Sequence, residues 1–293
     1  MSMKKIKCNG IVLNCWSVGE GEDVVLIHGL AANHAFWRLD VLLSFAKSHR
    51  VTIYDQRGHG YSEMPPEGYT SGDMAEDLHD LLRHHDISHA HLIGHSLGGL
   101  VALHYAAIHP ERVSSLTIAD SRVRAFQSNN YATDWPHWET ATMKLKEIGL
   151  SVREEEAEAG LWLLEQLAST EWQQARDKLK GSQLFIPFGG WSGGNKSADR
   201  WLKLMKTTTA KKDLTSLAGL TVEKLSMIQV PTLALYGEHS PTLQSMRGLM
   251  EHLPHCKTVI VPGKGHFFPL TQPKLFFDIV SQFLNSLQEV KLR

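Results

Sequence analysis

The first 120 residues alternate short apolar runs with longer stretches in which apolar residues recur at helical spacing. Nearly continuous apolar runs are typical of strands that are buried on both faces of a parallel sheet. Four such strands are expected, at 23–29, 51–55, 91–96 and 112–120. Helices are expected between them, at about 33–47, from Thr70 onward and at 97–109. An earlier apolar stretch at 11–18, preceded by the turn pair Asn9-Gly10, predicts a hairpin.

The pattern changes after Asp120. From about Ser121 to Leu214 there are helical stretches and Gly-rich connectors but no convincing strand. The alternation then returns, with strands expected at 231–237 and 257–263 and helices at about 242–252 and 274–289. Because strand–helix alternation builds a mostly parallel sheet covered on both faces, we expect an α/β domain of about eight strands. Its two parts, 1–121 and 215–293, are expected to be interrupted by a helical lid at 122–214.

Composition excludes several classes of function. The chain has 293 residues, of which 42% are hydrophobic, and its formal net charge is −1, so neither nucleic acid nor an anionic membrane surface is indicated as a partner. The three cysteines, Cys8, Cys15 and Cys256, form neither a disulfide framework nor a metal-binding C-x-x-C pair. No stretch approaches the ~20 apolar residues of a membrane helix, and no apolar run of signal-peptide length follows the N-terminus. The sequence predicts a cytoplasmic protein without membrane span, metal or cofactor.

The strongest chemical signal is Gly94-His95-Ser96-Leu97-Gly98, a G-x-S-x-G pattern between an expected strand and an expected helix. In such a turn the serine hydroxyl stands exposed at the carboxyl end of the sheet, and the glycines remove Cβ atoms that would crowd the turn. The alternative is a plain glycine-flanked turn. It is disfavoured because such a turn does not need the strand that is expected before the motif and the helix that is expected after it. Ser96 is therefore the candidate nucleophile.

Two further turns supply candidate partners for Ser96. Acyl transfer generates an oxyanion, which needs hydrogen-bond donors already in place. The backbone N–H groups of Leu97 and of Leu30, in the turn after the first buried strand, are the expected donors. The side chain of His28 beside Leu30 is expected to be a packed, hydrogen-bonded group. His266 follows the last expected strand on the loop Gly263-Lys264-Gly265, from which it can reach Ser96 as general base.

Motifs along nearly the whole chain resemble those of the α/β-hydrolase superfamily. They are HGL at 28–30, DQRGHGYS at 55–62, GHSLGG at 94–99, HPERV at 109–113, PTLALYGE at 231–238 and PGKGHFFP at 262–269. The resemblance implies the α/β-hydrolase fold and a serine-nucleophile branch similar to polyketide-pathway thioesterases and carboxylesterases. Dehalogenases and epoxide hydrolases of this fold use a carboxylate as nucleophile, so a serine argues against those branches. The segment 55–62, including Arg57, is expected to be structural.

One departure from the family pattern concerns the acid that would orient His266. Most relatives carry it three residues beyond the glycine that ends the strand at 231–236, where this chain has Ser240. A serine has no negative charge at neutral pH, so it cannot stabilise an imidazolium as an aspartate does. The best substitute is Asp120, which ends the expected strand at 112–120, at the carboxyl edge of the sheet where catalytic groups gather. Some members, including certain polyketide-pathway thioesterases, place their acid after that strand. Glu238 is the alternative acid, and a strand-end cap is the alternative role for Asp120.

The sequence thus predicts a serine hydrolase that cleaves a small-molecule carboxylic ester or thioester through an acyl-enzyme intermediate. Within the same fold, the alternatives are a cofactor-independent dioxygenase and a non-catalytic binding protein. The expected lid is rich in tryptophan, which either lines an acyl pocket or packs the lid's own core. Six of the eight tryptophans lie there: Trp135, Trp138, Trp162, Trp172, Trp191 and Trp201.

A basic segment in the expected lid also has two interpretations. Arg200, Lys203 and Lys206 fall at helical spacing, Lys211 and Lys212 follow, and no acidic residue occurs from 200 to 212. The simpler interpretation is the solvated face of a lid helix. The other is a docking surface for a phosphopantetheine arm or an acyl carrier protein.

Overall fold

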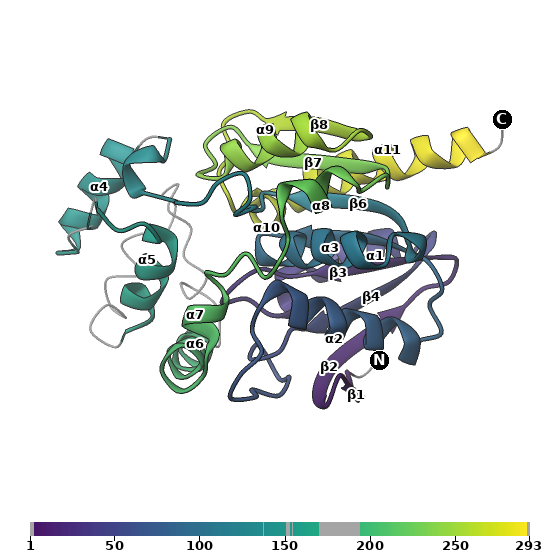
Figure 1. Cartoon of the computed structure of the whole chain (residues 1–293), viewed down its shortest axis with the longest axis horizontal. Helices are drawn as coiled ribbons and strands as arrows, with labels where there is room; N and C mark the ends of the chain where they lie inside the picture. The colour runs from purple at the N-terminus through teal and green to yellow at the C-terminus, as the bar shows by residue number, and fades with distance from the viewer. Residues whose placement is uncertain (1–2, 137, 151–152, 154, 170–193, 292–293) are drawn as a thin grey trace.

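The computed structural model of the chain describes residues 3–136, 138–150, 153, 155–169 and 194–291. An eight-stranded sheet lies at its centre, in the order β1-β2-β4-β3-β5-β6-β7-β8 (Figure 1). The pairs β1–β2 and β2–β4 are antiparallel, and the other five pairs are parallel. The strands are β1 Lys4–Cys8, β2 Ile11–Val18, β3 Glu22–Ile27, β4 His49–Asp55, β5 Ala90–His95, β6 Val113–Ala119, β7 Thr232–Gly237 and β8 Cys256–Val261. Every strand predicted from an apolar run is present.

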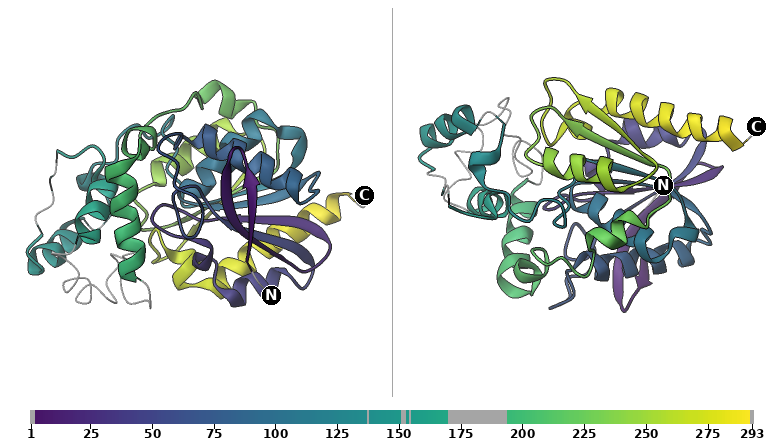
Figure 2. Two further views of the ribbon diagram at one scale, coloured as in Figure 1. Left: turned by 90° about the horizontal axis from the view of Figure 1, so that it is seen from below. Right: turned by 45° about the horizontal axis from the view of Figure 1, so that its top comes forward.

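Helices cover both faces of the sheet (Figure 2). Strand β3 shows why both faces must be covered: Val25 and Ile27 join the core on one face, and Val24 and Leu26 join the core on the other. The first face is covered by α2 Ser71–His84, α3 Leu97–Ile108, α8 Val222–Ser226 and α9 Leu243–His252. The second is covered by α1 Leu39–Phe45, α10 Phe268–Thr271 and α11 Pro273–Lys291. This two-sided burial is the arrangement predicted from the continuous apolar strands.

Helix starts follow local side-chain chemistry. The side chain of Thr70 accepts a hydrogen bond from the Asp73 N–H, and the Asp73 carboxylate accepts one from the Thr70 N–H, so a capping box begins α2 where it was predicted. The prediction of one helix at about 33–47 is wrong in detail. The stretch is a 3₁₀ turn, η1 His34–Phe36, followed by the shorter α1, because the chain is extended at Trp37, which is buried beside Phe36. No helix in the described part of the chain is long and apolar enough to cross a bilayer.

The segment between β6 and α8 contributes helices that project beyond one end of the sheet (Figure 1). They are η3 Ala132–Asp134, α4 Trp138–Glu147, α5 Ala159–Ala168, α6 Gly194–Thr207 and α7 Ala210–Asp213. Trp201 on α6 is fully buried and lies near His59 of the sheet domain, at a ring-centroid distance of 6.4 Å. Trp162 is partly buried against the main core, and Trp172 and Trp191 lie outside the described residues. The inserted helices therefore pack on the sheet domain through tryptophan.

The segment 55–62 is a structural junction, as expected. The buried Asp55 carboxylate accepts hydrogen bonds from the Asn14 side chain and from the Tyr61 N–H, at 2.8 and 2.9 Å. Arg57 forms a buried ion pair with Asp77 of α2. The 3₁₀ turn η2 Pro110–Arg112 connects α3 to β6 farther along the chain.

Arg200 corrects the view of the basic segment as one uniform face. It is half-buried, and its guanidinium donates hydrogen bonds to the carbonyl oxygens of Gly58 and Ser62. Buried carbonyls need donors, so this arginine anchors α6 to the junction and is not part of a solvated face. Lys203 and Lys206 are exposed, and Lys211 pairs with Glu165 of α5 at 2.9 Å.

Candidate active site

Ser96 occupies the sharp turn between β5 and α3. Its backbone has φ 54° and ψ −120°, a strained conformation for a residue with a Cβ atom. The Ser96 N–H donates to the Ala119 carbonyl of β6 at 3.0 Å, which fixes the turn to the neighbouring strand. A Cβ atom on Gly94 would collide with the Gly98 backbone, and one on Gly98 would collide with the Ile27 carbonyl. The two glycines of the G-x-S-x-G pattern are thus required by close backbone approach.

His266 lies between Ser96 and Asp120. Its Nε2 atom is 3.2 Å from the Ser96 Oγ atom, and its Nδ1 atom is 2.7 Å from the Asp120 Oδ1 atom. Because an ionised carboxylate only accepts hydrogen bonds, Nδ1 carries the proton and Nε2 of the neutral ring is left as an acceptor facing the serine. The loop after β8 therefore brings together three residues that lie far apart in the sequence.

Asp120 ends β6 and is fully buried. Its backbone has φ 53°, and its N–H donates to the Leu235 carbonyl of β7 at 3.0 Å. The Gly237 N–H donates to Oδ2 at 2.8 Å, and the Thr242 hydroxyl donates to Oδ1 at 3.0 Å. Burying a carboxylate is costly unless donors surround it, and here β7 and the loop that follows supply them.

Ser240 is a site residue that sequence reasoning missed. The sequence shows only that Ser240 replaces the usual acid, whereas in the structure its buried hydroxyl donates directly to Asp120 Oδ1. The Ser240 oxygen in turn accepts the Thr242 N–H at 3.1 Å. The signal was present in the sequence, because Ser240 occupies the position of the usual acid and a second hydroxyl residue, Thr242, follows it.

Glu238, the alternative acid, is exposed and bonds to the backbone of the loop after β8. Its Oε2 atom accepts the Gly263 N–H at 2.7 Å, which closes the loop after β8. The structure thus places Asp120, and not Glu238, against the imidazole.

The two expected oxyanion donors lie beside Ser96. Leu97 is the first residue of α3, and the first N–H groups of a helix have no partner within the helix. Leu30 lies on the loop after β3, and a Cβ atom on the preceding Gly29 would be only 2.9 Å from the Ser96 Cβ atom. Both leucines line the same cavity as Ser96.

Two buried histidines support these loops. His28 donates from Nδ1 to the Gly29 carbonyl at 2.8 Å and accepts the Gln56 N–H at Nε2 at 3.0 Å, the packed role expected for it. Burial lowers its pKa. His95, which sequence reasoning left without a role, hydrogen-bonds through Nε2 to the His266 carbonyl at 2.9 Å and stacks on Phe36. Burial lowers the His95 pKa well below its usual value, so the ring is neutral and Nε2 donates.

A cavity of about 460 Å³ opens above Ser96, within the usual size range of small-molecule sites. The sheet domain and the inserted helices both line it. Apolar side chains make much of its wall, among them Leu100, Trp135, Leu161, Leu164 and Leu214. Trp135, one of the six tryptophans, thus lines the cavity, and its indole N–H donates to the Asn130 side chain at 3.0 Å. Among the described residues, no group of three or more His, Cys, Asp or Glu side chains is placed to hold a metal ion.

The strand order, the strained serine turn between β5 and α3 and the helices on both sheet faces define a protein of the α/β-hydrolase fold. The chain belongs to the family described as alpha/beta hydrolase fold, whose sequence profile matches residues 24–273. It is an enzyme of this family.

Named relatives match along most of the chain. The chain is 27% identical over 272 residues to 3-oxoadipate enol-lactonase 1 of Acinetobacter baylyi, covering 90% of this chain and 89% of that protein. It is 26% identical over 281 residues to the pimeloyl-[acyl-carrier protein] methyl ester esterase of Aeromonas hydrophila, covering 91% and 96%. The solved enol-lactonase of Burkholderia xenovorans LB400 superposes with a TM-score of 0.69 at 21% identity, covering 96% of this chain and 100% of that one. The last likeness is one of fold.

Proposed function

We propose that the protein is a serine hydrolase that cleaves a carboxylic ester or thioester through an acyl-enzyme intermediate. The observation that carries the proposal is the hydrogen-bonded series from Ser96 Oγ through His266 to the buried Asp120. The relatives named as an enol-lactonase and a methyl ester esterase support the same class of bond. The cavity above Ser96 supports a small-molecule substrate.

The chemistry follows from the placement of protons. Nε2 of His266 removes the hydroxyl proton as Ser96 Oγ attacks the substrate carbonyl, and the carbonyl oxygen becomes an oxyanion. The N–H groups of Leu30 and Leu97 stabilise that oxyanion. The tetrahedral intermediate collapses, the leaving alcohol or thiol takes the proton from Nε2, and the acyl group remains on Ser96. A water deprotonated by His266 then releases the acid and restores the hydroxyl.

Asp120 keeps His266 ready for both steps. It holds the Nδ1 proton, so Nε2 is free to accept, and its negative charge stabilises the imidazolium that forms each time. Ser240, Thr242 and the Gly237 N–H hold the carboxylate in place. We assign them as positioning groups.

The inserted helices would act as a lid. In this proposal, 1–121 with 215–293 form the catalytic domain, and 122–214 cover the acyl pocket and set which acyl groups fit. Residues of α4 and α5 line the same cavity as Ser96, which supports that role.

The test is active-site labelling together with turnover. A fluorophosphonate reagent is expected to label the wild-type protein but not a Ser96→Ala variant, and the variant is expected to lose ester hydrolysis while keeping the wild-type melting temperature. A panel of methyl, p-nitrophenyl and thioester substrates of increasing chain length defines the acyl preference. Labelling that persists in Ser96→Ala contradicts the proposal, as does oxygen uptake without acid release.

A further inference from the structure

Positively charged side chains outnumber negatively charged ones in the described part of the cavity wall. Arg122 and Arg124 come from the loop after β6, and Lys144 comes from α4. Among the described residues that line the cavity, Glu158 at the start of α5 is the only carboxylate. Three positive charges thus face one negative charge, although the whole chain has a net charge of −1.

Glu158 has no capacity left for a further donor. Its Oε2 atom accepts from Arg122 Nη1 at 2.6 Å and from Arg124 Nη2 at 2.8 Å. Its Oε1 atom accepts from Arg124 Nη1 at 2.7 Å and from Arg122 Nη2 at 3.2 Å. A carboxylate offers about four acceptor sites, so all of them are occupied. One carboxylate holds two guanidinium groups, and one full positive charge remains between them.

The two guanidinium groups also keep hydrogen-bond donors that are not used by Glu158. Arg122 also donates to the carbonyls of Gln127 and Ser128, and Arg124 donates to those of Leu214 and Ser128. Each guanidinium has five N–H groups, so among the described residues each keeps one without a partner. Lys144 adds an ammonium group on the same wall.

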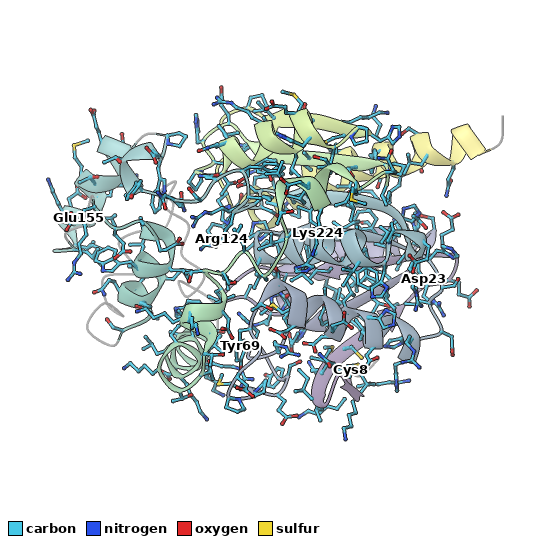
Figure 3. The ribbon with its side chains drawn as sticks, viewed as in Figure 1. Cys8, Asp23, Tyr69, Arg124, Glu155 and Lys224 are labelled. Atoms are coloured by element: carbon cyan, nitrogen blue, oxygen red, sulfur yellow. The ribbon has the colours of Figure 1, made fainter. Side chains whose placement is uncertain are left out.

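The surroundings neither screen nor fully compensate this charge. The side chains of Arg122 and Arg124 are only 14% and 11% exposed, so water screens them weakly. Burial lowers the pKa of Arg122, and the neighbouring Arg124 lowers it further against the opposing effect of Glu158. Figure 3 labels Arg124 where the inserted helices meet the sheet domain. Arg122 is two residues after Asp120, so the two Cα atoms lie within about 7 Å of each other.

We propose that this cluster, Arg122, Arg124 and Lys144, binds a carboxylate of the substrate, so that the enzyme prefers esters that carry a second, ionised acid group. The inference rests on the proposed function, because it names the class of ester that the same cavity takes. The remaining N–H of each guanidinium and the Lys144 ammonium can donate to the oxygens of a carboxylate, and an occupant of this kind supplies the negative charge that Glu158 alone does not.

The test compares monomethyl adipate with methyl hexanoate. These methyl esters have the same chain length and differ in a terminal carboxylate or methyl group. The quantity measured is the ratio of their kcat/KM values, followed by methanol release. One charge-assisted hydrogen bond gives a preference of about tenfold for the adipate ester, and a ratio below one in the wild-type enzyme overturns the proposal.

Substitutions in the cluster and at Glu158 are expected to change this ratio in opposite directions. Arg124→Gln is expected to lower the ratio about tenfold, and Lys144→Gln to lower it about threefold. Glu158→Gln removes the competing carboxylate, so it is expected to raise the ratio. Lys206→Gln, an exposed lysine on α6, is the matched control and is expected to leave the ratio unchanged.

The directions of these changes distinguish carboxylate binding from a purely structural role of the arginines. If the arginines only fasten the inserted helices, Glu158→Gln and Lys144→Gln change turnover of both esters equally, and the unchanged ratio overturns the proposal. If neither ester is cleaved by the wild-type enzyme, fluorophosphonate labelling of Ser96 tests the proposed function separately. Calorimetric titration with adipate then decides: binding that Lys144→Gln weakens and Glu158→Gln tightens supports the site, and absence of binding overturns it.

Discussion

Replacing Asp120 by asparagine isolates the charge of the proposed acid. Asparagine has the same shape and tolerates the positive φ of this position, so the backbone can keep its course. The substitution removes the negative charge and presents an amide to His266. The ring then loses the acceptor that holds its Nδ1 proton, at present 2.7 Å from Asp120 Oδ1. The free enzyme keeps its cavity, so KM is expected to change little while kcat falls.

The contact between Asp120 and His266 sets the size of the expected fall in kcat. With the carboxylate directly hydrogen-bonded to the ring, the two charges are about 4 Å apart, and at an effective dielectric constant of about 20 their attraction is about 4 kcal/mol. Losing it slows turnover about 10³-fold, since each ~1.4 kcal/mol is a factor of ten. The wrong tautomer adds to this loss, so a fall of about 10³ to 10⁴ in kcat is expected.

Steady-state hydrolysis of a neutral ester, with a thermal melt of each variant, checks this prediction. Glu238→Gln is the matched control, because Glu238 is exposed and its carboxylate accepts the Gly263 N–H, and the kcat of this variant is expected to stay within about twofold of wild type. A crippled Glu238→Gln beside an Asp120→Asn variant of normal turnover would refute the assignment. Asp120 would then be a strand-end cap.

Three further predictions use other parts of the structure. Ser240→Ala removes a buried donor to the carboxylate, so the free energy of unfolding is expected to fall by about 1 kcal/mol and kcat to fall more than KM changes, as measured by melting and kinetics. Charge reversal of Lys203 and Lys206 to glutamate raises KM for carrier-bound thioesters at low salt if this exposed face docks a carrier, and leaves p-nitrophenyl esters unaffected; equal KM values favour the solvated face. Burial acts to raise the pKa of Asp55, but hydrogen bonds from His34 prevail and hold it at about 2. A lowered pKa contributes about 2 kcal/mol of stability that is present above pH 4 and lost as pH falls toward 2, so acid titration of Asp55→Asn should show a flatter stability curve there.

The fold and the placement of Ser96 could be predicted because their signals are local. Continuous apolar runs identified every parallel strand, and the glycines around Ser96 reflect contacts within and beside one turn. Asp120 could be proposed because parallel strands bring their carboxyl ends to one edge, where His266 also lies. In each case a short window of sequence, together with one rule of sheet topology, contains the needed information.

The partners of these residues could not be predicted in the same way. Ser240 and Asp120 are separated by 120 positions, and His95 reaches the carbonyl of His266 across 171. Arg200 looked like part of a basic helix face, yet it binds carbonyls of the segment 55–62. No periodicity records such contacts, because they depend on how distant loops pack.

The acid can lie at Asp120, with a serine at the usual acid position, because β6 and β7 are neighbouring strands. Asp120 ends β6 and Ser240 follows β7, and the Asp120 N–H bonds to the Leu235 carbonyl, so both side chains meet at one point beside His266. The imidazole needs one carboxylate there, and the carboxylate in turn needs a donor. Either strand can supply either group, provided that the other strand supplies its complement. In this chain the acid comes from β6 and the hydroxyl from the loop after β7. The double variant Asp120→Asn with Ser240→Asp reverses the two roles, and recovery of kcat above that of Asp120→Asn alone would show that position along the chain matters less than the meeting point.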